Sequence, residues 1–230
     1  MAVERELLVS ILKLTRRGPI RRELVSRDAR IPIQTANDLL REFYDEGVIR
    51  LRGKVIEASP RQRVRVAIRA IESGADLERV CKALEWMEFE NVASEVFEVN
   101  GYHVKKRFRF KWFGRRWEVD VVGCKEPMVL CADCKHWLRG WRRSAIVETV
   151  ELQLERTEAL ADALPSLREK LELTNWRQAT LVPVVISLVP ASLRFYNNVP
   201  IVPILQLQNF LSELIGHVDS LMHLTIILQH

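Results

Sequence analysis

The sequence predicts an α/β protein in which a mixed sheet is flanked by helices and preceded by a small helical module. Two near-continuous apolar runs, residues 179–189 and 199–205, predict strands that are buried on both faces. Three more strand-length segments lie between residues 102 and 135 and are separated by short turns. Helical periodicity precedes and follows them. The order therefore favours one layered α/β domain over residues 76–230.

The first 58 residues predict three helices and a two-stranded wing. The helices 4–15 and 20–27 are separated by Gly18-Pro19, and Pro32 stands where the first turn of a third helix is expected. Gly47 ends that helix, and segments 48–51 and 54–57 form the wing. This order resembles winged helix-turn-helix domains of archaeal DNA-binding proteins, whose third helix enters the major groove. The exposed DNA-contact candidates are Gln34, Thr35, Asn37, Asp38, Arg41, Arg50, Arg52 and Lys54. Winged helices that bind protein or dimerise remain an alternative.

Residues 59–75 predict a linking helix crowded with four arginines, which is either a solvated spacer or a phosphate-facing surface: Arg61, Arg63, Arg65 and Arg69. Residues 76–99 then repeat apolar side chains at helical spacing, and Asn100-Gly101 ends this helix. Its acidic residues are by default expected on a solvated face: Glu85, Glu88, Glu90, Glu95 and Glu98.

Two acids and a lysine lie on the two strands that follow. Asp120 is flanked by valines, and Asp133 and Lys135 end an apolar segment. Side chains two residues apart on a strand share a face, so Asp133 and Lys135 point the same way. Because charged groups are rarely buried unless they are paired or bind metal, this apolar context points away from an ordinary solvated pair. Carboxylates and an ammonium at a strand end suit metal-dependent phosphodiester cleavage.

The ordered set of motifs resembles the PD-(D/E)XK nuclease superfamily, with Mrr-type restriction endonucleases and archaeal Holliday-junction resolvases as the nearest likeness. Glu90 precedes Gly101-Tyr102 by eleven residues, and Asp120 precedes Asp133 by thirteen. The likeness covers residues 86–210 and implies a restriction-endonuclease-like fold. Two positions depart from the pattern: Val119 replaces the proline, and Asp133 stands where glutamate is more frequent.

The resemblance also implies roles. Asp120, Asp133 and the Cys134 carbonyl would bind Mg²⁺ or Mn²⁺, Glu90 would hold a metal-bound water, and Lys135 would orient the attacking water. The product would be a nick with a 5′-phosphate. Related nucleases place a polar residue of the next helix, here predicted over 144–163, near the site, which nominates Gln153; His136 is a second auxiliary candidate.

Charge is unevenly distributed along the chain. The net charge is +5, while residues 1–75 hold 16 basic and 10 acidic side chains and residues 105–143 hold 12 and 4. Basic surfaces attract nucleic acid. In the second zone arginines alternate with tryptophans, as suits DNA contact, although tryptophans packed into the core remain an alternative. Its DNA-contact candidates are Arg115, Arg116, Arg139, Arg142 and Arg143.

The remaining features of the sequence limit the classes of protein to which the chain can belong. The four cysteines are expected as buried free thiols, since Cys131 and Cys134 would face opposite sides of a strand and no second pair follows at zinc spacing. A bridge from Cys124 to Cys131 or Cys134 stays open. No apolar run reaches membrane-spanning length, and a cytoplasmic protein is expected. The apolar tail 206–228 is expected to form a helix pair or a homodimer surface.

These expectations converge on a Mg²⁺- or Mn²⁺-dependent DNA endonuclease in repair, recombination or defence. The alternative is a catalytically inactive DNA-binding regulator or scaffold on the same fold. An RNA-processing enzyme would use the same site chemistry.

Overall fold

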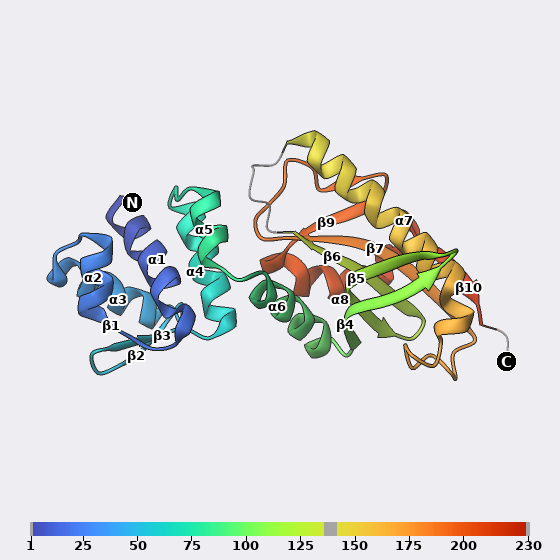
Figure 1. The fold of residues 1–230 in the computed structure, drawn as a ribbon, viewed down its shortest axis with the longest axis horizontal. Coiled ribbons are helices and arrows are strands. Elements are labelled where there is room, and N and C mark those ends of the chain that lie inside the picture. Colours follow the sequence, from blue (N-terminus) through green and yellow to red (C-terminus); the bar gives the residue numbers. More distant parts are fainter. Residues whose placement is uncertain (1, 136–141, 229–230) are drawn as a thin grey trace. The chain divides into compact units, whose positions relative to one another are not determined.

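The computed structural model describes residues 2–135 and 142–228, and the chain divides into two compact units (Figure 1). The first unit extends to Val92 and the second begins at Ala93. Both carry a sheet, and the larger one is a mixed sheet flanked by helices, as the sequence predicts. The expected division placed boundaries at residues 58 and 75 instead.

The first unit begins with three helices and a small antiparallel sheet in the order β1-β3-β2. Its core forms where apolar residues of all three helices meet, with Leu7, Leu8, Leu40 and Phe43 almost fully buried. Gly53, at φ +59°, forms the turn between the second and third strands. The elements are α1 (Ala2–Leu14), β1 (Ile20–Arg21), α2 (Arg22–Ala29), α3 (Ile33–Asp45), β2 (Arg50–Arg52) and β3 (Val55–Glu57).

The expected linking helix is α4 (Pro60–Glu72), and its start is encoded locally. Ser59 caps the helix: its Oγ accepts from the Gln62 amide at 3.4 Å, and the Gln62 side chain accepts from the Ser59 amide at 3.0 Å. Pro60 takes the first helical position, where its missing N–H has no cost.

Arg63 of α4 is neither a solvated spacer residue nor a phosphate-facing one. It is 2% exposed, and its guanidinium lies 2.5 Å from Glu88 and donates to the carbonyls of Leu12 (2.6 Å) and Ala83 (2.9 Å). A buried charge is stable only when it is paired, so this arginine ties the first unit together. Its partner Glu88 therefore does not lie on the solvated face that was expected for it.

The single helix predicted over 76–99 is wrong, because two helices occupy it: α5 (Leu77–Ala83) and α6 (Trp86–Val99). Leu84 is extended, at φ −89° and ψ 126°. Arg63 binds the last carbonyl of α5, and the Glu88 carboxylate accepts from the Glu85 amide at 2.9 Å. These contacts satisfy the backbone groups that the break exposes. Apolar periodicity continues across the break and gave no sign of it.

The second unit is a seven-stranded sheet in the order β4-β5-β6-β7-β9-β8, with β10 pairing to β7. The first three strands are antiparallel, and β6, β7 and β9 are parallel. All but the first residue of β7 are buried, as expected for a strand covered on both faces. The strands are β4 (His103–Trp112), β5 (Arg115–Lys125), β6 (Met128–Lys135), β7 (Gln178–Ser187), β8 (Phe195–Tyr196), β9 (Val199–Pro203) and β10 (Leu224–Ile227).

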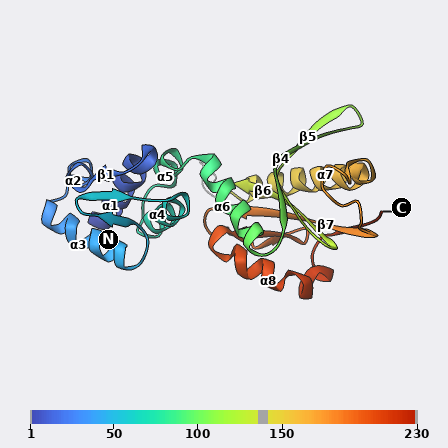
Figure 2. The same cartoon turned by 90° about the horizontal axis from the view of Figure 1, so that it is seen from below.

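Helices cover both faces of this sheet (Figure 2). The long α7 (Arg143–Leu167) packs on one face, where Leu160 and Leu164 join Val122, Val129 and other sheet residues in a buried cluster. The helix α8 (Leu207–His217) lies on the other side. The helix pair expected over 206–228 is wrong, because β10 pairs with residues 178–181 of β7, a stretch that β9 leaves open.

All four cysteines are buried free thiols, as predicted. Burial raises the pKa of Cys81 and of Cys124 to about 12, so both stay protonated at neutral pH. Within the described part of the chain, no helix has both the length and the apolar character needed to cross a membrane.

Candidate active site

The strands β5 and β6 bring the two aspartates together. Their antiparallel register pairs Val121 with Ala132, so Asp120 and Asp133 are each the next residue beyond the last pair of this ladder. The Asp120 Oδ2 atom accepts a hydrogen bond from the Cys134 amide at 2.8 Å. The two acids, thirteen residues apart in the sequence, therefore lie on adjacent strands at the carboxyl end of β6.

Asp133 is the buried centre of the site. It is 1% exposed, and its carboxylate contacts two cations. Lys135 Nζ lies 3.0 Å from Oδ1 and 2.9 Å from Oδ2, and an Arg156 guanidinium nitrogen lies 2.6 Å from Oδ1. Its Oδ2 atom lacks a hydrogen bond of good geometry despite the nearby ammonium. A carboxylate buried this deeply needs such cations, because burial alone disfavours its charge.

Arg156 was not expected from the sequence. It lies on α7, one turn beyond Gln153, and three-residue spacing places both side chains on the face that covers β6. That spacing from Gln153 was the available signal, but nothing in the sequence distinguished Arg156 from the many surface arginines.

Gln153 supports the strand beneath the site. It is fully buried, and its Nε2 atom donates to the Cys131 carbonyl at 2.6 Å. Its Oε1 atom and the Oγ atom of the buried Ser187, whose strand position pairs with Lys135, have no hydrogen-bond partner among the described residues. Unsatisfied buried oxygens of this kind are uncommon in folded proteins.

The sheet is distorted at Asp120. Lys106 pairs with Val121 and Phe108 with Val119, but Arg107 between them adopts φ +50°. Val119 and Val122 both join the cluster under α7, which strict alternation forbids. The strand β5 therefore turns about its axis between these two valines, and Asp120 lies in that turn.

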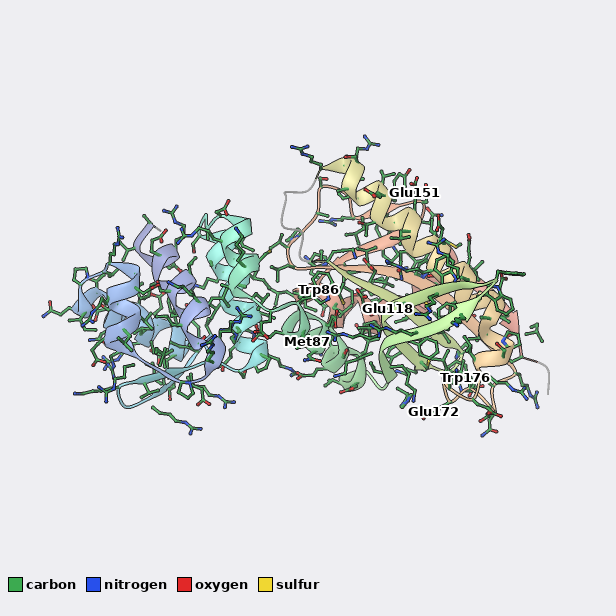
Figure 3. All side chains as sticks on the ribbon, viewed as in Figure 1. Trp86, Met87, Glu118, Glu151, Glu172 and Trp176 are labelled. Atoms are coloured by element: carbon green, nitrogen blue, oxygen red, sulfur yellow. The ribbon has the colours of Figure 1, made fainter. Side chains whose placement is uncertain are left out.

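Glu90, the helical acid of the predicted set, lies on α6. It lies in the portion of α6 that belongs to the first unit, is 5% exposed and accepts a hydrogen bond from the Trp86 indole nitrogen. Figure 3 shows Trp86 and Met87 at the start of this helix. Such burial departs from the solvated face that helical glutamates occupy by default.

The DNA-contact candidates of the first unit lie mostly on its surface. Gln34, Thr35 and Arg41 of α3 are exposed, as are Arg50, Arg52 and Lys54 of the hairpin. Asn37 is half-buried, and its Oδ1 atom accepts from Arg22 at 3.1 Å, so it links α3 to α2.

In the second unit, Arg115 and Arg116 lie on β5 beside the turn of the β4–β5 hairpin, and Arg142 and Arg143 begin α7, all four exposed. The candidates Arg139 and His136 lie outside the described residues. Trp112 and Trp117 are half-buried and pack against the buried cluster under α7. This matches the alternative in which the tryptophans pack into the core.

The two aspartates are the candidate ligands for a divalent cation. No group of three or more His, Cys, Asp or Glu side chains suited to a metal occurs among residues 2–135 and 142–228. Mg²⁺, however, usually keeps several waters and needs only one or two carboxylates. Asp133 offers a buried oxygen that is ion-paired with Lys135 but has no hydrogen bond of good geometry, and Asp120 lies on the next strand. The donor set therefore suits a hydrated Mg²⁺ or Mn²⁺.

Comparisons with known proteins give one relative by sequence and one weak structural similarity. No protein-family model matches it. The crystal structure of protein VC1899 from Vibrio cholerae aligns with 95% of this chain at a TM-score of 0.36 and 13% identity, and the alignment spans 52% of the VC1899 chain. An uncharacterized protein of Archaeoglobus fulgidus is 33% identical over 132 residues, which are 57% of this chain and 92% of that protein. The chain therefore belongs to the same family as this uncharacterized Archaeoglobus fulgidus protein.

Proposed function

We propose that the protein is a metal-dependent endonuclease that hydrolyses DNA phosphodiester bonds. The observation that carries the proposal is the buried Asp133 with Lys135 against it and Asp120 on the neighbouring strand. The sheet, with α7 on one face, supports a restriction-endonuclease-like core, and the α1-β1-α2-α3-β2-β3 order supports a winged helix before it.

Each residue of the site has a proposed role in hydrolysis. Asp120, Asp133 and the Cys134 carbonyl would hold the cation, which supplies Lewis acidity at the phosphate and an acidified water. Lys135 would orient the attacking water and would offset the negative charge that develops on the phosphate in the transition state. The water would lose a proton as its oxygen bonds to phosphorus and the bond to the 3′ oxygen breaks. The leaving 3′ oxygen would take up a proton and become a hydroxyl, and the phosphate would stay on the 5′ end.

The alternative is an inactive DNA-binding regulator or scaffold on the same fold. It is favoured by Arg156, whose guanidinium contacts the same carboxylate oxygen as Lys135. Two permanent cations on Asp133 offset the charge with which it would attract a metal. The two functions differ in their response to Mg²⁺ and Mn²⁺.

Mutation of the site tests the choice. Asp120→Ala and Lys135→Ala should each lower the rate of DNA cleavage at least about 100-fold, the lower range for a positioned catalytic group. DNA binding, measured by fluorescence anisotropy, should stay within about twofold, because neither residue lies in the proposed winged helix. The matched control is Asp162→Asn, an exposed acid of α7, which should cleave like the wild type.

Cleavage is measured on linear, branched and single-stranded DNA, each titrated with Mg²⁺ and with Mn²⁺. Cleavage that persists in both alanine variants removes the proposed mechanism. DNA binding without cleavage by the wild type, with either metal and on every substrate, supports the scaffold instead.

A further inference from the structure

The turn of the β4–β5 hairpin carries an exposed aromatic side chain in an unfavourable backbone conformation. Phe113 is 90% exposed and adopts φ +45°, followed by Gly114 at φ +74°. Two positive φ angles define the tight turn that favours Asn-Gly, and a bulky residue at its first position costs about 1–2 kcal/mol. Strain of this kind tends to occur at functional positions.

Cations surround this turn. Lys111 and Arg116 lie directly opposite each other in the ladder, and both are exposed. Like charges in directly opposed positions destabilise a strand pair. An anion bound between them would relieve that repulsion. Figure 2 shows the β4–β5 turn projecting beyond the other strands of the sheet.

A groove lies along the two strands of the hairpin. It encloses about 690 Å³ and combines cations with aromatic rings. Its one acid, Glu118 (Figure 3), lies 2.7 Å from Arg109. The lining residues are Arg109, Phe110, Lys111, Arg116, Trp117, Glu118, Leu167 and Lys170.

The aromatic ring beside the groove is already paired with a cation. The Arg115 guanidinium lies 3.8 Å from the Trp117 ring centre, and Arg115 also lies 3.3 Å from Glu155. The Trp117 indole nitrogen is buried without a hydrogen-bond partner among the described residues. Phe113 and Trp112 contact each other in a T-shaped arrangement at 5.0 Å between ring centres, and Phe113 is still 90% exposed.

We propose that this hairpin binds single-stranded nucleic acid, with Phe113 stacking on an unpaired base and Lys111 and Arg116 holding the adjacent phosphate. An aromatic ring and a basic groove are the two features that bind an unpaired base on a phosphate chain. A base inside a duplex presents no free face to Phe113, so the contact selects unpaired segments. The inference rests on the proposed function for the role of this contact, which is to direct the nuclease to DNA with unpaired bases.

The test measures binding by the full chain in EDTA, which separates binding from cleavage. Fluorescence anisotropy follows single-stranded DNA, single-stranded RNA and duplex DNA, each of about 16 nucleotides or base pairs, the upper range for one single-strand-binding domain. Phe113→Gly removes the ring and accepts the positive φ without strain, so misfolding cannot explain a loss of binding.

Phe113→Gly should weaken single-strand binding about tenfold, which corresponds to about 1.4 kcal/mol for one stacked base. Its affinity for duplex DNA should not change, and its melting temperature should not fall. Phe113→Tyr keeps the ring and should restore binding. The control is Phe195→Ala, a second exposed phenylalanine, which should bind like the wild type.

Replacing both Lys111 and Arg116 with glutamine should weaken binding of single strands and duplex alike and reduce its salt dependence. Whether the variants lose binding of single-stranded DNA or of single-stranded RNA identifies the polymer that the hairpin binds. The proposal is overturned if Phe113→Gly binds single strands like the wild type, or loses single-strand and duplex binding equally. If the wild type fails to cleave DNA but the variants lose binding as described, the proposed nuclease activity is refuted and the proposed hairpin contact is supported.

Discussion

At the residue scale, the candidate site is a balance of charge around one buried carboxylate. Asp133 is fully enclosed, whereas Lys135 and Arg156 reach it with partly exposed side chains. The spacing of Asp133 and Lys135 was predictable, because strand alternation places residues i and i+2 on one face. Arg156, 23 residues further along the chain, was not predictable, since only the packing of α7 on β6 brings it there.

Arg156→Gln should destabilise the metal-free protein by about 1–3 kcal/mol, because it removes a charged hydrogen bond from a buried carboxylate that keeps Lys135. Urea unfolding measures this change. Glu155→Gln, the adjacent residue whose ion pair with Arg115 is exposed, should change stability by less than about 1 kcal/mol. Equal effects of the two substitutions would show that Asp133 does not depend on its second cation.

At the scale of secondary-structure elements, the fit between β5 and α6 depends on a glycine. A Cβ atom added to Gly123 would lie 2.3 Å from Phe97 Cδ1 and 3.4 Å from Tyr102. Both rings are buried and meet edge-on at 5.5 Å, so neither can move away freely. The sequence shows only a glycine inside a strand, which is typical of a close approach but does not name the partner.

Gly123→Ala should therefore lower the free energy of unfolding of the second unit by about 1–3 kcal/mol through overpacking. Gly216→Ala is the matched control, because a Cβ atom there meets nothing within 4 Å and the residue lies within α8. Alanine in that helix should be neutral or slightly stabilising. Thermal unfolding of both variants measures the contrast, and a destabilised Gly216→Ala with an unaffected Gly123→Ala would contradict the packing described for β5.

At the scale of the whole molecule, positive charge gathers in two zones, residues 1–75 and 105–143. Part of that charge is structural: Arg63 and Arg69 bind glutamates of their own unit. The exposed remainder includes the hairpin of the first unit, where Arg50, Arg52 and Lys54 lie at the surface. Counting basic residues in the sequence therefore overstates the charge available to a nucleic acid.

Salt dependence of DNA binding tests this distribution. Replacing Arg50, Arg52 and Lys54 with glutamine should lower the slope of log affinity against log salt by about 0.9 for each phosphate that the variant no longer neutralises. Arg177→Gln removes an exposed cation outside both zones and should leave the slope unchanged. A triple variant with the wild-type slope would remove this hairpin from the DNA interface.

The sequence by itself determined the hairpin of the first unit, the strands β4, β5, β6, β7 and β9, the two-faced burial of the parallel strands and the face shared by Asp133 and Lys135. Each follows from the local period of the chain, which needs no knowledge of distant residues. Tertiary structure alone decided the break before α6, the pairing of β10 with β7 and the arrival of Arg156 at Asp133. These depend on contacts between segments far apart in the chain, where a buried charge or an unpaired strand edge must find its partner.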